Sequence, residues 1–597
     1  YQGICRTERF SSGIIDDGGA AETEISEGDI MGYHAMQSLL DDMSSHSRRS
    51  LRYRNTPMDY VKSSPYLLSF MESYQLKKQI TDYFSGGRHL ELVKGVNSKY
   101  LLLKKSAIHG YAPIPANNAR LTKLKEIVFD GGKNGAENLL WIPASKAYYR
   151  TGSVFDKNKD YSKVLVFSSW EMVPRMVSVM LSYESERMTI GKLFHNAKQR
   201  RGRGYFATRE ERRFGISRLK NETEDIMCLV SRTLAKLYSP GDYLGSDIEQ
   251  IRKSLAASLE PKITAVRNKF HLTQSGNAGA KALIELIKAL DNRPFAAPTV
   301  IPSNAVDTLV NMAIGSPAIC TFRLLNGNEE AAQKLAKEVF VSLFNKAESS
   351  AILDLLYGSR EDDAYYESVF RYCVDGNLQA VLDEYAHILT ESGAGLAEAM
   401  IESFADTASL QIDTLESFTG ADHEKARMRT HFAVGYFNAR ISNENVIRTE
   451  KIRKAFNSPF RPFVLSTTSI GQEGLDFHCY CRRVMHWNLP SNPIDLEQRE
   501  GRINRYKCLA VRQNVAHRYG TEPTWDAMFE KAAEKEKGLS SDLVPYWCLN
   551  EQGLDSVKIE RFVPMYPMSQ DKIRYIRLIK VLSLYRLTLG QPRQEEL

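Results

Sequence analysis

The residues whose types and spacing point most directly to chemistry are Arg502 and Arg505, in the segment DLEQREGRINR. If this segment is helical, side chains three positions apart lie on one face. Two guanidinium groups on one face can stabilise the charge that develops on a transferring γ-phosphoryl group. The alternative is a solvated basic helix whose arginines are paired with Glu497 and Glu500. On this segment alone both interpretations stay open.

A second segment, FVLSTTSIGQEGLD over residues 463–476, precedes the arginines by about twenty residues. It is a buried strand that ends in hydroxyl residues, followed by a turn with two glycines and then Asp476. In α/β sheets, ligands bind at the carboxyl ends of the strands, where hydroxyls and backbone amides can hold phosphates. This pattern predicts a ligand-binding loop.

A third group of residues is the basic segment 192–220, which holds ten Lys and Arg with four interleaved aromatic residues. Positive charge attracts a nucleic-acid backbone, and aromatic rings can stack on unpaired bases. The alternative is a solvated loop. We favour nucleic-acid contact, and the residues that we expect to make it are Lys198, Arg200, Arg201 and Arg203.

Strands and helices must position these residues. KVLVFSSW (163–170) reads as a buried strand that leads into a helix, a βα unit typical of a parallel sheet. LLWIPAS also reads as a short buried strand, and strand patterns return at HFAVGYF, FVLSTTS and RRVMHWNLP. Between them, residues 181–430 show apolar spacings of three and four, typical of helices. We therefore predict one α/β domain interrupted by a mainly helical insertion of about 250 residues, a size that loops tolerate.

In this order, the segments resemble motifs IV, V and VI of superfamily 2 helicases, and LEQREGRINR looks especially like the Swi/Snf-type branch. ICRTERF (4–10) looks like the segment that closes the first RecA-like domain of that branch. The resemblance implies a RecA-like parallel-sheet domain with phosphate-facing arginines at 502 and 505. It implies nucleotide contacts by Gly474, Asp476 and Gln498, and nucleic-acid contacts by Ser168, Ser169 and Thr468.

The resemblance also divides the chain. It implies the end of a first RecA-like domain plus a helical region in 1–110, and the first part of the second RecA-like domain in 111–180. The insertion follows in 181–430, the rest of the RecA-like domain in 431–520, and a C-terminal helical extension in 521–597.

A helicase also needs a phosphate-binding loop of the form G-x-x-x-x-G-K-[ST], which holds ATP and Mg²⁺. The sequence has no such loop. Lysines follow Gly132 and Gly191, but neither has the six-residue loop or the hydroxyl residue of the motif. The chain begins at Tyr1 without methionine, so we expect an upstream domain to bind ATP and Mg²⁺ and this fragment alone to be inactive. DEYAH (383–387) mimics a DExH box, but we expect it to be plain helix surface.

The amino-acid composition limits the class of protein to which the chain can belong. The 597 residues are 43% hydrophobic and 25% charged with a net charge of +7, as in ordinary globular proteins that suit a polyanion partner. The sequence has no run of eighteen or more apolar residues, so no membrane span is expected. Its eight cysteines are scattered and do not predict a disulfide scaffold. His478, Cys479, Cys481 and Cys508 are poorly spaced for zinc, so no metal site is expected. Core packing is expected for Trp170, Trp487 and Trp547.

The leading hypothesis is therefore the C-terminal motor half of a cytoplasmic, ATP-dependent DNA helicase or translocase. Glu473 stands where many RNA-unwinding relatives have arginine, which favours DNA over RNA. The rivals are an RNA helicase and a non-catalytic scaffold that binds nucleic acid. No membrane is expected as a partner. Family likeness alone implies other proteins of a phage-defence or repair system.

Overall fold

The computed structural model describes most of the chain, in fifteen stretches. These are residues 14–46, 56–84, 98–195, 204–207, 217–276, 279–295, 300–391, 395–404, 408–422, 424–436, 443–468, 475–536, 544–549, 556–567 and 569–588. The segment 4–10, likened above to the end of a first RecA-like domain, lies outside these residues.

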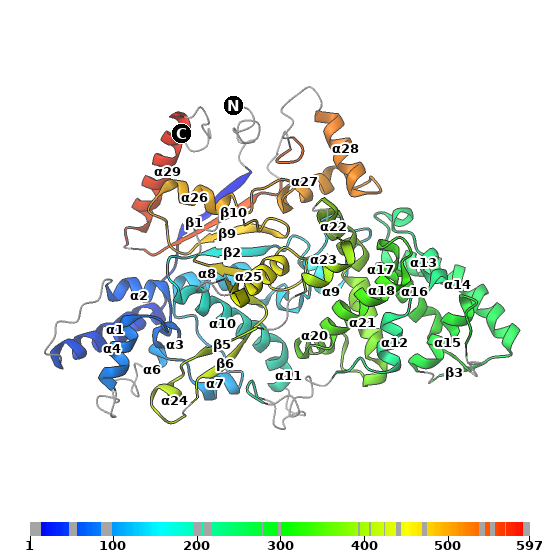
Figure 1. Ribbon diagram of the computed structural model, residues 1–597, viewed down its shortest axis with the longest axis horizontal. Coiled ribbons are helices and arrows are strands. Elements are labelled where there is room, and N and C mark those ends of the chain that lie inside the picture. The colour runs from blue at the N-terminus through cyan, green and yellow to red at the C-terminus, as the bar shows by residue number, and fades with distance from the viewer. Residues whose placement is uncertain are drawn as a thin grey trace.

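A six-stranded sheet, parallel throughout, forms the centre of the molecule (Figure 1). The strand order is β1-β10-β9-β2-β8-β7. The bounds are β1 Ile15–Glu22, β2 Lys163–Phe167, β7 Ala433–Tyr436, β8 Val464–Thr467, β9 Cys481–His486 and β10 Ile559–Met565. Strands predicted at KVLVFSSW, HFAVGYF, FVLSTTS and RRVMHWNLP are confirmed as β2, β7, β8 and β9. LLWIPAS is not a strand; it is buried, and only Trp141 makes an isolated bridge, to Phe460.

The side chains of β2 point alternately to the two faces of the sheet, and each face packs into a different hydrophobic core. All five residues of β2 are buried. Val164 and Val166 belong to the larger core, which extends into the insertion, whereas Leu165 and Phe167 belong to a second core. Because successive strand side chains point to opposite faces, a strand buried on both faces is apolar at every position. This explains why KVLVF has no polar alternation.

Helices cover both faces. On one face lie α8 (Ala119–Phe129) and α10 (Met172–Glu186), and on the other lie α26 (Pro493–Glu500), α27 (Leu509–Tyr519), α28 (Trp525–Glu536) and α29 (Asp571–Thr588) (Figure 1). Helix α25 (Asn443–Phe456) and the short helix α9 (Ser153–Lys157) also belong to the sheet domain. The N-terminal helices are the long α1 (Glu27–His46) and the shorter α2 Pro57–Ser63, α3 Leu67–Phe70, α4 Gln75–Phe84, α6 Ser98–Leu101 and α7 Lys105–His109.

Both ends of the described chain enter the same sheet. β1 lies in the segment assigned above to a preceding domain, and β10 lies in the segment expected to be a helical extension; they pair in parallel, with Ile15 opposite Ile559. The close pairing needs a glycine, since a Cβ at Gly19 would lie 2.5 Å from the carbonyl oxygen of Arg561. The 521–597 segment is therefore not purely helical, and residues 15–22 belong to the sheet described here.

The insertion is mainly helical, as predicted. Its longer helices are α14 (Ile248–Phe270), α15 (Ala280–Leu290), α16 (Ala305–Gly315), α17 (Pro317–Leu324), α20 (Ala347–Tyr357), α21 (Tyr365–Asp375), α22 (Leu378–Glu391) and α23 (Leu396–Glu402). Two short strand pairs were not predicted: β3 (Thr273–Ser275) with β4 (Val300–Pro302), and β5 (Ala408–Ile412) with β6 (Ala426–Thr430). Residues Ala305–Leu324 are long and apolar enough to cross a membrane, but 78% of that window is buried inside the protein, as in a core helix.

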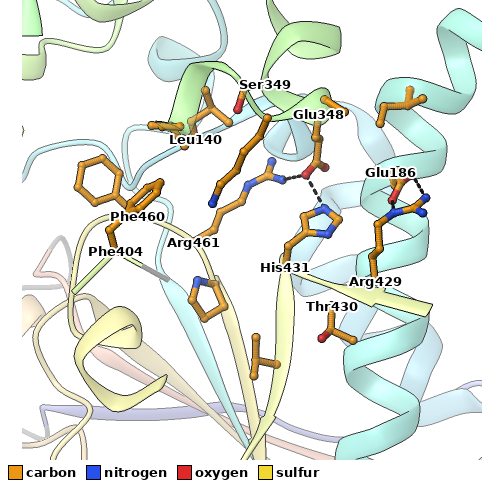
Figure 2. A pocket seen from close by; sticks show the side chains of 16 residues that line it. Leu140, Glu186, Glu348, Ser349, Phe404, Arg429, Thr430, His431, Phe460 and Arg461 are labelled. Atoms are coloured by element: carbon orange, nitrogen blue, oxygen red, sulfur yellow. Dashed lines mark hydrogen bonds and ion pairs between the residues drawn. The ribbon is translucent and has the colours of Figure 1, made fainter. Parts of the chain in front are cut away.

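Buried ion pairs fasten the insertion to the sheet domain around a cavity of about 120 Å³. Figure 2 shows the side chains of His431 and Arg461 pointing at the carboxylate of Glu348, a residue of insertion helix α20. Beside them, Glu186 at the end of α10 pairs with Arg429 of β6. These contacts fix the insertion against the sheet. The fold is thus α/β, with a parallel sheet and a large mainly helical insertion, as predicted.

Candidate functional site

The turn that carries the two arginines begins where α26 ends. Asn492 caps α26 by accepting a hydrogen bond from the Ile494 amide, and the helix stops at Glu500. The amides of Arg502 and Ile503 then donate to the carbonyl oxygens three residues back. These bonds close tight turns around Gly501, a residue of low helix propensity. Arg502 and Arg505 therefore lie beyond the helix, and the expectation that a helix aligns them is wrong.

The two arginines nevertheless meet at the same loop. Arg505 Nε donates to Asp476 Oδ1 at 2.7 Å, and Arg502 Nη1 donates to the Leu475 carbonyl at 3.1 Å. The loop is bound in return, because the Phe477 amide donates to the Arg502 carbonyl at 2.9 Å. Motif-like segments separated by more than twenty residues are thus joined into one site. Gly474, predicted to be part of it, lies outside the described residues.

Like charges lie close together in this turn. Burial and the neighbouring charge of Arg505 lower the pKa of Arg502, and Asp476 offsets only part of that effect. Arg502 is 7% exposed, so water screens the repulsion poorly. An anion placed between the two guanidinium groups would relieve it. The turn therefore carries an excess of positive charge beside Asp476.

The residues just before the turn form a buried ionic network. Glu500 accepts two hydrogen bonds from Arg561 of β10, at 2.5 and 3.0 Å, and each side chain is 2% exposed. His486 of β9 approaches Glu500 at 3.4 Å, and burial lowers its pKa to about 4. Glu500 is therefore not the solvated partner that the alternative interpretation of this segment required. The network fixes the turn to the middle of the sheet.

Asn457 is a positioning residue that the sequence did not indicate. Its side-chain amide donates to the Asp476 carbonyl at 2.7 Å, and its side-chain oxygen accepts from the Cys479 amide at 3.4 Å. Asn457 directly follows α25, where nothing in the sequence distinguishes it from an ordinary helix end. It holds the Asp476 loop on both sides.

Asp476 and Arg505 open onto a cavity of about 510 Å³. Arg453 and Lys454 of α25 and the His478 side chain also line it. The size lies within the range of small-molecule pockets. Arg453 and Lys454 are the basic residues in the last turn of α25, and nothing else in the sequence indicated that they line a cavity.

The predicted strand-contacting residues lie at the carboxyl ends of β2 and β8. These strands pair with Phe167 opposite Thr467, so Ser168 and Thr468 follow at the same edge. Ser168 is buried and already engaged, since its hydroxyl donates to Asn488 at 2.8 Å and accepts from the Trp170 amide. Ser169 is exposed and Thr468 is half-buried. Ser169 and Thr468 are thus the accessible members of this group.

Other predicted residues do not join the site. Gln498 is exposed on α26. Lys198, Arg200, Arg201 and Arg203 lie outside the described residues. Of the aromatic residues in the same basic segment, Tyr205 is fully buried, and its ring lies 3.8 Å from the guanidinium of Arg429. Tyr205 therefore packs inside the protein and is not available to stack on a base.

The DEYAH segment is not plain helix surface. Glu384 is 1% exposed and pairs with Arg512 at 2.9 Å, while Asp383 accepts a hydrogen bond from Tyr148 at 2.6 Å. The His387 ring packs against the rings of both Trp525 and Phe529. Glu384 holds the insertion against α27 and Asp383 holds it against Tyr148, so the segment has a packing role that its helical periodicity did not reveal.

The tryptophans and cysteines have ordinary surroundings with one exception. Trp487 is fully buried and Trp170 packs at the edge of the larger core, as expected, but Trp547 is half-buried and lines the cavity beside Arg505. The Cys479 sulfur lies 4.0 Å from His478 Nε2. Across the part of the chain that the structure describes, no cluster of three or more His, Cys, Asp or Glu residues could hold a metal ion.

Comparison with known families agrees with this geometry. Residues 404–507 match the family described as Helicase conserved C-terminal domain, a segment that contains β7, β8, β9 and both arginines. No curated protein and no solved structure matches the chain. Strands β1, β2 and β10 complete the sheet from outside the matched segment. Residues 404–507 therefore form a helicase C-terminal domain of RecA-like α/β fold, within a chain that adds a large helical insertion.

Proposed function

We propose that the chain is the arginine-bearing motor half of an ATP-dependent DNA translocase or helicase of the Swi/Snf-like branch. Arg502 and Arg505 would face the γ-phosphate of ATP bound on a neighbouring lobe that carries the phosphate-binding loop. The observation that carries this proposal is the convergence of both arginines on the Asp476 loop at the mouth of a cavity.

The residues present suit a nucleotide but supply only part of its site. Asp476 can accept hydrogen bonds from ribose hydroxyls, and the two guanidinium groups can neutralise phosphate oxygens. The carboxylates that would hold Mg²⁺ are assigned to the neighbouring lobe, as is the phosphate-binding loop. When bound, the metal would supply charge neutralisation between phosphate oxygens. This chain's role would be to place two positive charges where negative charge develops.

The nucleic-acid partner would lie along the carboxyl edge of β2 and β8. Ser169 and Thr468 are accessible there, and the basic segment around residues 198–203 would add charge. DNA is the proposed partner, in keeping with Glu473, and RNA is the alternative. From family likeness, we further propose a cytoplasmic location and a role in a defence or repair system.

The test is nucleic-acid-stimulated ATP hydrolysis by the full-length protein. Arg505→Ala should abolish turnover while DNA binding is retained, and Arg518→Ala on the exposed face of α27 is the matched control. Stimulation by RNA in place of DNA would support an RNA helicase. Turnover that is unchanged in Arg505→Ala, or absent from the wild type while DNA still binds, would favour a non-catalytic scaffold.

A further inference from the structure

The cavity beside Arg505 has two chemically different halves. The helicase C-terminal domain supplies the polar half, which includes Asp476, Arg505 and Asn457. The insertion supplies the other half from α22 and α23, which carries the apolar side chains of Ile388, Leu389 and Ala399 and, at the end of α23, the polar Glu402 and Ser403. Figure 1 shows both helices on the side of the insertion that lies nearest the sheet. The insertion is therefore part of this cavity and not a distant appendage.

Aromatic side chains also line the cavity. The Tyr506 side chain follows Arg505 directly and is 43% exposed, and its ring stacks on that of Tyr546 with a centroid separation of 5.4 Å. Trp547 lines the same cavity and is half-buried. Partly exposed aromatic rings in a cavity are well suited to stack on a planar, apolar group.

The polar half holds unused hydrogen-bonding capacity. His478 Nδ1 is buried and has no hydrogen-bond partner among the described residues, although a buried polar atom normally has one. Arg453 and Lys454 are paired with Glu450 and Glu402, but these pairs are partly exposed. Phosphate oxygens can compete for cations held in such weak surface pairs. A ligand with hydroxyls and phosphates would use all three groups.

We infer that this cavity is a nucleotide pocket in which the insertion forms the wall for the base. The base would lie against Ile388, Ala399 and Trp547, the ribose beside Asp476, and the phosphates towards Arg505. A nucleoside phosphate has the same order of apolar ring, hydroxyls and negative charge. A cavity of about 510 Å³ is of the size that encloses a small ligand. The inference rests on the proposed function in taking the ligand to be a nucleotide.

A single-stranded nucleic acid is the competing ligand, because it offers the same chemical groups. The observations favour a mononucleotide, since α22 and α23 wall the cavity on one side. A continuous strand needs a groove that is open at both ends and a row of cations that follows its phosphates. The test below separates the two.

The experiment measures binding to the 597-residue chain by fluorescence titration with a ribose-labelled fluorescent ADP, by competition with unlabelled ADP and tripolyphosphate, and by separate titration with a labelled oligodeoxythymidine. Ala399→Trp fills the apolar half of the cavity, and Glu398→Trp places the same ring on the exposed side of α23. Trp547→Ala removes the stacking surface without filling the cavity. Thermal melting of each variant verifies that it is folded.

The inference predicts that the wild-type chain binds ADP, and that Ala399→Trp and Trp547→Ala each weaken ADP about tenfold or more, as expected for lost base stacking. Glu398→Trp should bind as the wild type does, and tripolyphosphate should compete equally in all four proteins. Absence of ADP binding, or equal ADP affinity in folded Ala399→Trp and Trp547→Ala, would overturn the inference. So would a loss of oligonucleotide binding in these variants with ADP binding intact. The Arg505→Ala turnover test is independent of each of these outcomes.

Discussion

Arg505 Nε and Asp476 Oδ1 are 2.7 Å apart, so a residue proposed to face phosphate is held by a residue proposed to face ribose. Both side chains are partly exposed at the cavity, at 31% and 38%. A nucleotide whose ribose takes the Asp476 carboxylate would free the Arg505 guanidinium for phosphate. On the proposed function, the pair would couple recognition of the sugar to placement of the arginine.

Asp476→Asn should separate these two effects. The substitution removes the charged acceptor, so ADP affinity should fall about tenfold, in keeping with a hydrogen bond to a charged group. Tripolyphosphate affinity should rise, because Arg505 loses its counter-charge. Competition against the fluorescent ADP measures both. Parallel losses for ADP and tripolyphosphate would show that the pair is only structural.

The buried pair of Glu500 and Arg561 should dominate the stability of the arginine-bearing turn. Arg561→Met leaves a buried carboxylate without its partner and should cost about 3–5 kcal/mol in the free energy of unfolding. Arg577→Ala on the exposed face of α29 is the control and should change it by less than about 0.5 kcal/mol.

The double variant Glu500→Leu with Arg561→Met should recover much of that loss, because it removes both charges. Urea denaturation measures all of these variants. A loss below about 1 kcal/mol in Arg561→Met would contradict the role given to the pair.

His486 predicts a pH dependence of stability. Burial lowers its pKa to about 4, against about 6.5 in an unfolded chain. The unfolded state therefore takes up a proton first, and the stabilisation present above pH 6.5 is lost as the pH falls towards 4. His486→Gln should flatten the fall in unfolding free energy between pH 6.5 and 4.5. An unchanged slope would mean that His486 titrates alike in both states.

Glu348 predicts that the insertion can be loosened from the sheet domain. Burial alone would raise the pKa of Glu348, but Arg461 and His431 hold it below its ordinary value (Figure 2). Glu348→Gln removes the charge that both cations contact and should lower the stability by about 3–5 kcal/mol. Hydrogen exchange should rise first in α20 and β6. Glu285→Gln, in a helix pair with Lys288 on α15, is the control.

The sequence predicted strands β2, β7, β8 and β9 and missed β1 and β10, which lie together at one side of the sheet. The run KVLVF is apolar at four positions because β2 is buried on both faces, and such a run is easily recognised. β1 contains Gly18 and Gly19, which are poor strand formers, and their place in the sheet depends on the close approach of Arg561. Pairing between residues as far apart in sequence as Ile15 and Ile559 leaves no local pattern.

The site was predicted through its charged residues, while its walls were not. The resemblance assigned Asp476, Arg502 and Arg505 to one nucleotide, and the structure joins them through hydrogen bonds, but the helix expected to align the arginines ends at Glu500. The apolar periodicity of α22 predicted a helix without indicating what it packs against. The insertion's contribution to the cavity, through Ile388 and Ala399, depends on tertiary contacts alone.

The single-turnover rate constant of ATP hydrolysis by the full-length protein on DNA tests the central claim most directly. Both Arg502→Ala and Arg505→Ala should lower it by about 10³-fold or more, the range for an arginine that stabilises phosphoryl transfer. The dissociation constant for DNA should stay within about twofold, since neither arginine is assigned to the nucleic acid. A rate constant within threefold of the wild type in both variants would contradict the account.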